Sequence, residues 1–279
     1  MDIIGGFSGA CGSWYQGVSM IISKYCASGN DFLIFHSFLE QNRAKMAVEL
    51  CNRFYGIGAD GMVVVLPYEN KDSHIAYKWE FYNADGSFAG MCGNASRAVS
   101  LYAFHNKLAT QNHSFLSGAG IIDTSIKEII DSKHAYVQSN LGEYILQGNI
   151  VENKKGSVYE FEHIIMRIPH LVYFATSMKE FNLLSNDLEF LSHLRHKYDA
   201  NVNIAIREND KIYYVTFERG IENITQACGT GACAVYVSLR DFSKTYTLIP
   251  PSKERLQVSY NNGLIYFSGL VTKVCDCVL

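Results

Sequence analysis

The stretch YKWEFYNADGSFAGMCGNA (residues 77–95) is echoed later in the chain by IYYVTFERGIENITQACGTG (residues 212–231). In each, a strand-like apolar run leads through a polar loop to a Cys-Gly pair, and then into apolar residues at helical spacing. Phe81 precedes Cys92 by the same interval as Phe217 precedes Cys228. The echo therefore predicts two related halves, each carrying a cysteine from a strand to the beginning of a helix.

Outward from these motifs, the chain alternates strand-like and helix-like segments, which is typical of an α/β fold. The other expected elements are strands at 21–25, 32–35 and 62–66, helices at 44–54 and 179–198, a polar loop at 149–156, and two closing strands within 264–279. The glycine-rich segment 56–61 precedes a strand instead of following one into a helix. It is therefore interpreted as a tight turn and not as a dinucleotide-binding loop.

Length and composition exclude several classes of protein. The 279 residues allow one large domain or two of ordinary size, and 48% hydrophobic residues exclude disorder for most of the chain. With 24 Lys and Arg against 27 Asp and Glu, the net charge is −3. No basic block marks a nucleic-acid or anionic membrane partner, and no apolar run is long enough to span a bilayer.

Residues 1–19 contain no Lys or Arg and several glycines, which is unlike a secretory signal. We expect them to form a loose extension or to reflect an upstream start, and we expect a cytoplasmic protein whose thiols stay reduced. The predicted organisation is an extension at 1–19, a first half at 20–142 with Cys92, and a second half at 143–279 with Cys228. The last strand of the second half is a candidate to return to the first half.

A cysteine at a helix N-terminus lies among unsatisfied N–H groups at the positive end of the helix dipole, which predicts a thiol pKa lowered toward neutrality. The N–H groups of the following residues also suit a carboxylate ligand: Gly93, Asn94, Gly229 and Thr230. Two such elements facing each other place a thiol on either side of one carbon. That arrangement fits racemisation or epimerisation next to a carboxylate, with one cysteine as thiolate and the other as thiol.

The remaining cysteines have simpler interpretations. Cys275 and Cys277 lack zinc-site spacing and have no paired histidine motif, so no metal is expected. Together with Cys26, Cys51 and Cys233, they are interpreted as packing residues.

The sequence resembles diaminopimelate epimerase at several blocks in the family order. These blocks are Ser28–Phe32, Gly56–Gly61, Phe81–Ser87 with Met91–Asn94, Pro169-His170, Val202–Ile204, and Glu218–Gly220 with Ala227–Ala232. The resemblance implies two pseudo-symmetric domains, each a curved mixed sheet or barrel around a central helix, with the active site in the cleft between them. It further implies cofactor-independent interconversion of LL- and meso-diaminopimelate in lysine and peptidoglycan precursor synthesis, with a homodimer as a candidate assembly.

The resemblance also implies roles for individual residues. Cys92 and Cys228 would be the acid and base, and the backbone of Gly93-Asn94 and Gly229-Thr230 would hold the carboxylate of the reacting centre. Glu218 would bind an ammonium group and, with His170, would tune the thiols. The remaining polar groups of the substrate would be bound by Asn30, Asn83, Asn203 and Arg219.

Three departures from the family pattern bear on substrate preference. Arg167 and Ile168 stand where Gly-Asn commonly precedes Pro-His, so an amide contact is absent or supplied elsewhere. The loop before Cys228 is one residue longer, and Ala95 stands where glycine is common. None of these changes removes a catalytic group.

Two alternatives are kept. The first is a proline- or hydroxyproline-type racemase with the same paired thiols, which would not need the set of polar residues expected to bind the far end of the substrate. The second is a non-catalytic redox sensor in which Cys92 and Cys228 form a reversible disulfide, which leaves that same set unexplained. Isomerases of phenazine pathways share the fold but lack the cysteine pair.

Overall fold

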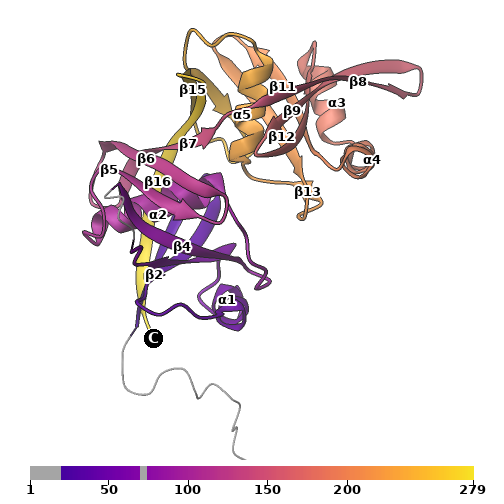
Figure 1. The fold of residues 1–279 in the computed structure, drawn as a ribbon. Helices are drawn as coiled ribbons and strands as arrows, with labels where there is room; N and C mark the ends of the chain where they lie inside the picture. Colours follow the sequence, from indigo (N-terminus) through magenta and orange to yellow (C-terminus); the bar gives the residue numbers. More distant parts are fainter. Residues whose placement is uncertain (1–19, 70–73) are drawn as a thin grey trace, which may run out of the picture.

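A computed structural model describes residues 20–69 and 74–279 of the chain. The predicted N-terminal extension, residues 1–19, lies outside the described residues. Strands dominate, and helices are few and short, so the protein is of the mixed α+β class. Figure 1 shows two sheet-built halves joined by a long strand, β16.

Eight strands of the first half form a closed barrel. In order around the ring they are β1 (Ile21–Ala27), β2 (Asn30–His36), β3 (Gly61–Leu66), β4 (Ile75–Asn83), β5 (Asn112–Ser117), β6 (Gly120–Ile129), β7 (His134–Gly142) and β16 (Leu264–Val278). The ring closes where β16 pairs antiparallel with β1, from Val278 opposite Ile21 to Val271 opposite Ala27. Closure leaves this half without an open sheet edge.

The second half continues the same sheet from β16. Its strands follow in the order β15 (Leu256–Asn261), β14 (Tyr246–Ile249), β12 (Lys211–Glu218), β11 (Asn201–Glu208), β10 (Ile168–Phe174), β9 (Ser157–Met166) and β8 (Ile145–Lys154), with β13 (Asn223–Ile224) pairing with β12. Because β16 pairs with β7, β1 and β15, it belongs to both halves. The boundary expected at residue 142 stays a prediction.

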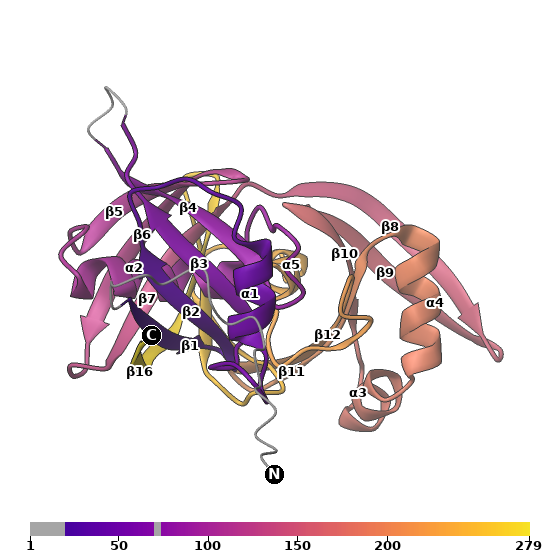
Figure 2. The ribbon, with the colours of Figure 1, turned by 90° about the horizontal axis from the view of Figure 1, so that it is seen from below.

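The two halves repeat one topology. In the first, α1 (Ala44–Cys51) connects the parallel strands β2 and β3, and α2 (Gly93–His105) connects the parallel strands β4 and β5. In the second, α3 (Met178–Ser185) and α4 (Leu188–Tyr198) connect the parallel strands β10 and β11, and α5 (Gly229–Ser238) connects β12 and β14. In Figure 2, α1 and α4 lie on the outside of their sheets. The internal echo of the sequence is thus a repeat of strand, helix and strand.

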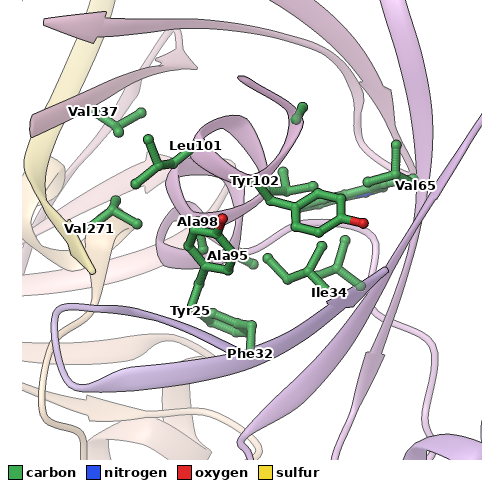
Figure 3. Packing of buried hydrophobic residues seen from close by; sticks show 14 of the residues in the cluster. Tyr25, Phe32, Ile34, Val65, Ala95, Ala98, Leu101, Tyr102, Val137 and Val271 are labelled. Carbon is green, nitrogen blue, oxygen red and sulfur yellow. The ribbon is translucent and has the colours of Figure 1, made fainter. Parts of the chain in front are cut away.

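Each central helix is enclosed by its sheet. Every residue of α2 from Gly93 to Ala103 is buried, and Figure 3 shows Ala95 and Ala98 among side chains from the surrounding strands. Small residues on this helix let the strands approach its backbone closely. The second central helix, α5, is buried from Ala232 to Val237 among apolar residues of β12, β14, β15 and β16.

Three expectations about individual elements are wrong. The expected helix at 179–198 is two helices, because the Asp187 carboxylate accepts a hydrogen bond from the Phe190 N–H, 3.2 Å away, and begins α4 anew. The segment at 149–156 belongs to the β8–β9 hairpin, which turns at Lys155 and Gly156. The closing strands at 264–279 are one strand, β16.

The expectation that the five remaining cysteines are packing residues is correct for Cys51 and Cys233, which are buried. It is wrong for Cys275, which is exposed like its neighbours Val274 and Asp276 near the end of β16. In the described part of the chain, no helix has the length and apolar character needed to cross a membrane.

Candidate active site

A cavity of about 560 Å³ lies between the two halves, at the first turns of α2 and α5. Ten of the twelve residues that the sequence analysis assigned to the site line this cavity. They are Asn30, Asn83, Cys92, Gly93, Asn94, Glu218, Arg219, Cys228, Gly229 and Thr230. The two others, His170 and Asn203, lie behind the cavity wall.

Both cysteines occupy the position immediately before a central helix. Cys92 has φ −145° and ψ 125°, and Cys228 has φ −115° and ψ 116°, so each residue is extended and begins its helix as an N-cap. The Cys228 sulfur accepts a hydrogen bond from the Gly231 N–H at 3.4 Å and lies 3.4 Å from the Thr230 hydroxyl. Both cysteines are free thiols.

The glycine after each cysteine allows the two helix ends to come close together. A Cβ placed on Gly93 would lie 3.7 Å from the Gly229 Cα. The Asn94 side chain crosses between the halves and donates from Nδ2 to the carbonyl oxygen of Ala227, 3.2 Å away. Two sets of helix N–H groups and two thiols therefore face one small space.

The prediction that the helix N-termini lower both thiol pKa values is wrong for this arrangement. Burial raises the pKa of the Cys92 thiol to about 11 and raises that of Cys228 further. Backbone N–H groups do oppose the rise, but removing the thiolate from water outweighs them. Burial thus favours the thiol form of both cysteines, and more strongly at Cys228 than at Cys92.

The two thiols differ in their charged neighbours. The negative charge of Glu218 is the largest electrostatic contribution raising the Cys228 pKa after burial itself. Glu218 also raises the pKa of Cys92, but there the buried guanidinium of Arg97 acts in the opposite direction. Burial in turn raises the pKa of the Glu218 carboxyl.

His170 and Asn203 support α5 from behind. The Asn203 amide donates from Nδ2 toward His170 Nδ1 at 3.1 Å, and its Oδ1 accepts from the Thr216 hydroxyl at 2.8 Å. Both side chains are fully buried, and burial lowers the pKa of His170 to about 3, so its imidazole is neutral. A Cβ on Gly231 would lie 2.6 Å from Asn203 Oδ1, which places the amide against the first turn of the helix.

Asparagine side chains form the opposite wall of the cavity. Asn94 Nδ2 donates to Asn30 Oδ1 at 2.6 Å, and Asn30 Nδ2 donates to Asp60 Oδ2 at 3.1 Å. Asp60 is itself paired with Arg53 at 2.7 Å. Asp60 was not among the predicted site residues, because the glycine-rich segment that contains it was interpreted as a tight turn. Its carboxylate is the one feature of that segment that could have indicated a role at the site.

Arg219 and Arg167 bring positive charge to the cavity. Arg219 lines it and pairs with Asp199 at 3.0 Å. Arg167, noted in the sequence only as a departure from the family pattern, also lines it. The family pattern indicated that this position is near the substrate, but the hydrogen-bond partners of the guanidinium could not be read from sequence, because they depend on how β9 and β10 meet the first half.

The family model for diaminopimelate epimerase matches residues 22–146 of the chain. The diaminopimelate epimerase of Helicobacter pylori is 43% identical over 274 residues, which cover 93% of this chain and 96% of that protein. The chain belongs to the diaminopimelate epimerase family. The proteins of that name from a Nitratiruptor species and from Campylobacter jejuni are 42% and 40% identical, over 92% and 90% of this chain and 97% and 95% of their own lengths. As a member of this family, the chain is an isomerase.

Solved structures show the fold alone. A probable proline racemase from Agrobacterium radiobacter superposes with a TM-score of 0.70 at 9% identity, covering 92% of each chain. A phenazine biosynthesis protein of the PhzF family from Enterococcus faecalis gives 0.67 at 14% identity, covering 94% of this chain and 99% of its own. Both confirm the expected architecture, and neither favours the racemase alternative over the family to which the sequence belongs.

Proposed function

We propose that this chain interconverts LL-diaminopimelate and meso-diaminopimelate by moving a proton between opposite faces of one α-carbon, with Cys92 and Cys228 as the two acid–base groups. The observation that supports the proposal is that one cavity is lined by both helix-capping cysteines and by the two residues that follow each of them. The family relationship supports the choice of substrate.

The proton balance needs one thiolate and one thiol. In one direction the Cys92 thiolate takes the α-proton, and the Cys228 thiol gives its proton to the opposite face of the same carbon. The enzyme then holds a Cys92 thiol and a Cys228 thiolate, and the reverse reaction restores the first state. Each cysteine is thus a base in one direction and an acid in the other.

Developing negative charge on the substrate has partners at both helix ends. As the α-proton leaves, electron density moves into the neighbouring carboxylate. N–H groups at Gly93-Asn94 and Gly229-Thr230 stabilise that charge, and the burial of both helix ends strengthens the interaction. The same N–H groups select for a carboxylate at the reacting centre.

We assign the ionised thiol of the starting state to Cys92. Arg97 favours a negative charge there, whereas the negative charge of Glu218 disfavours a thiolate at Cys228 and keeps that residue a thiol. The α-ammonium group of the substrate fits beside Glu218, where it would offset the carboxylate charge. The far end of the substrate would be bound by the other polar residues of the cavity wall, Asn30, Asn83 and Arg219. Asn203 would not touch the substrate but would position the first turn of α5. The expected homodimer stays a prediction.

Incubation in deuterium oxide under reducing conditions tests the substrate. Purified protein with LL-diaminopimelate is expected to form meso-diaminopimelate carrying deuterium at the inverted carbon, and L-proline treated in parallel is expected to remain unlabelled. Deuterium entering only proline would contradict the proposal.

A further inference from the structure

Arg167 is a cation on the cavity wall that no carboxylate neutralises. It lies between β9 and β10, and its side chain is half-buried and lines the cavity. Its Nε donates to the Leu141 carbonyl oxygen at 2.8 Å, and Nη1 lies 3.2 Å from the Ala119 carbonyl oxygen. Both partners are uncharged, and the described residues contain no ion pair to this guanidinium.

The other charges at the cavity wall are partly engaged by the protein. Asp60 is paired with Arg53 at 2.7 Å, and Arg219 with Asp199 at 3.0 Å. Glu218 is the charged group with the largest effect on the Cys228 thiol. Arg167 is therefore the lining cation whose positive charge has no acid opposite it within residues 20–69 and 74–279. Burial lowers its pKa, as expected for a cation removed from water without a counter-charge.

The backbone at Arg167 is held in an unfavourable conformation. Its φ is +62°, in the left-handed region where a side chain is disfavoured and glycine is not. Strain of this kind persists where the surrounding structure fixes a residue in place, and it is frequent at ligand sites. Here the two carbonyl hydrogen bonds attach the guanidinium to β7 and to the β5–β6 turn of the other half.

We propose that Arg167 binds the distal carboxylate of the substrate, the one remote from the reacting carbon. This inference rests on the proposed function, in which the helix N-termini hold the proximal carboxylate and Asn30, Asn83 and Arg219 bind the far end; Arg167 adds to that end a cation with no acid opposite it. The guanidinium uses Nε and Nη1 for the two carbonyl oxygens, which leaves Nη2 as a further donor for a carboxylate. A dicarboxylic diamino acid would then be preferred over a monocarboxylic one.

The test compares Arg167→Gly with the wild-type enzyme. Glycine relieves the positive φ, so the variant is expected to fold with an unchanged or higher Tm. Loss of a charge-assisted hydrogen bond is expected to raise the KM for LL-diaminopimelate roughly 10- to 100-fold, with kcat changed much less. Guanidinium ion at millimolar concentration is expected to restore part of the affinity, and tetramethylammonium at the same ionic strength is not. Arg167→Lys is expected to lie between the wild type and Arg167→Gly.

Lys155→Gly is the matched control. Lys155 is also a cation at positive φ, +49°, but it lies exposed at the turn of the β8–β9 hairpin, outside the cavity lining. Its replacement is expected to leave KM and kcat within about twofold of the wild type.

Distinct outcomes separate failure of this inference from failure of the proposed function. An active wild-type enzyme with an unchanged KM in Arg167→Gly overturns the role of Arg167 and leaves the function standing. A parallel loss of kcat and Tm without guanidinium rescue shows a purely structural role and also overturns it. A wild-type enzyme that does not label diaminopimelate overturns the proposed function, and the assignment of Arg167 with it.

Discussion

The first turns of α2 and α5 have nearly the same backbone and different surroundings. Each begins with an extended cysteine followed by glycine, and each is enclosed by a sheet of its own half. Behind Cys92 lies the buried cation Arg97, whereas beside Cys228 lies the carboxylate of Glu218. A repeated scaffold thus supplies two equivalent positions for proton transfer, and unequal charges decide which thiol ionises first.

The largest expected effect comes from replacing either of the two cysteines, because each is required for proton transfer. Cys92→Ser and Cys228→Ser are each expected to lower the epimerisation rate by about 10²- to 10⁴-fold, because a hydroxyl is a far weaker acid than a thiol and cannot supply the base. The assay measures conversion of LL- to meso-diaminopimelate under reducing conditions, and Cys275→Ser, at an exposed position, is the control. Full activity in either single variant would refute the two-thiol mechanism.

The next largest effect is expected from replacing Arg97, and it concerns the stability of the fold. Its guanidinium donates to Ser28 Oγ at 2.6 Å and Asn94 Oδ1 at 2.8 Å, and it lies 4.6 Å from the centre of the Phe267 ring. Arg97→Met would leave buried acceptors without donors, so the free energy of unfolding is expected to fall by about 3 kcal/mol or more.

Chemical denaturation measures the effect of Arg97→Met. The control is Arg240→Met, which removes a surface ion pair to Glu162 and is expected to cost less than about 1 kcal/mol. Equal losses in the free energy of unfolding of the two variants would show that the buried hydrogen bonds of Arg97 stabilise the fold no more than a surface ion pair does.

Glu218→Gln is expected to bring the pKa values of the two thiols closer together. The carboxylate charge raises the pKa of both thiols, so a neutral amide should lower both, and more at Cys228 than at Cys92. Epimerisation is expected to slow by about 10- to 100-fold, because the substrate ammonium loses its counter-charge.

The pH dependence of alkylation at each cysteine, followed by peptide mass spectrometry, measures the effect of Glu218→Gln. Glu222→Gln is a suitable control, since Glu222 is in the same loop but pairs with Arg195 outside the cavity lining. A pKa at Cys228 that stays unchanged or rises in Glu218→Gln would contradict the asymmetry.

The smallest expected effect concerns the third residue after each cysteine, which is Ala95 in α2 and Gly231 in α5. A Cβ on Gly231 would lie 2.5 Å from the Thr216 hydroxyl oxygen, so Gly231→Ala is expected to destabilise the fold by about 1–3 kcal/mol. The reciprocal Ala95→Gly is expected to cost about 1 kcal/mol through helix propensity alone. Thermal denaturation compares them, and a Gly231→Ala variant as stable as the wild type would show that the two helix starts are packed alike.

Much of the site could be predicted from the sequence because its signals are local. The Cys-Gly pairs and their spacing from the preceding strands predicted both helix starts and the meeting of two halves. The pKa values could not be predicted, since they depend on how completely the sheets and the opposite helix exclude water from each thiol. The roles of Arg167 and Asp60 could not be assigned for a related reason: their hydrogen bonds and ion pairs depend on strand pairing that brings distant segments to one cavity.

The position of isotope at early times in deuterium oxide tests the two-thiol mechanism most directly. If one cysteine removes the proton and the other returns a different one, meso-diaminopimelate formed at the initial rate should carry deuterium at the inverted carbon. The remaining LL-diaminopimelate should then still carry hydrogen. Deuterium appearing in recovered LL-diaminopimelate as fast as in the meso product would show that a single group serves both faces, and would contradict the account.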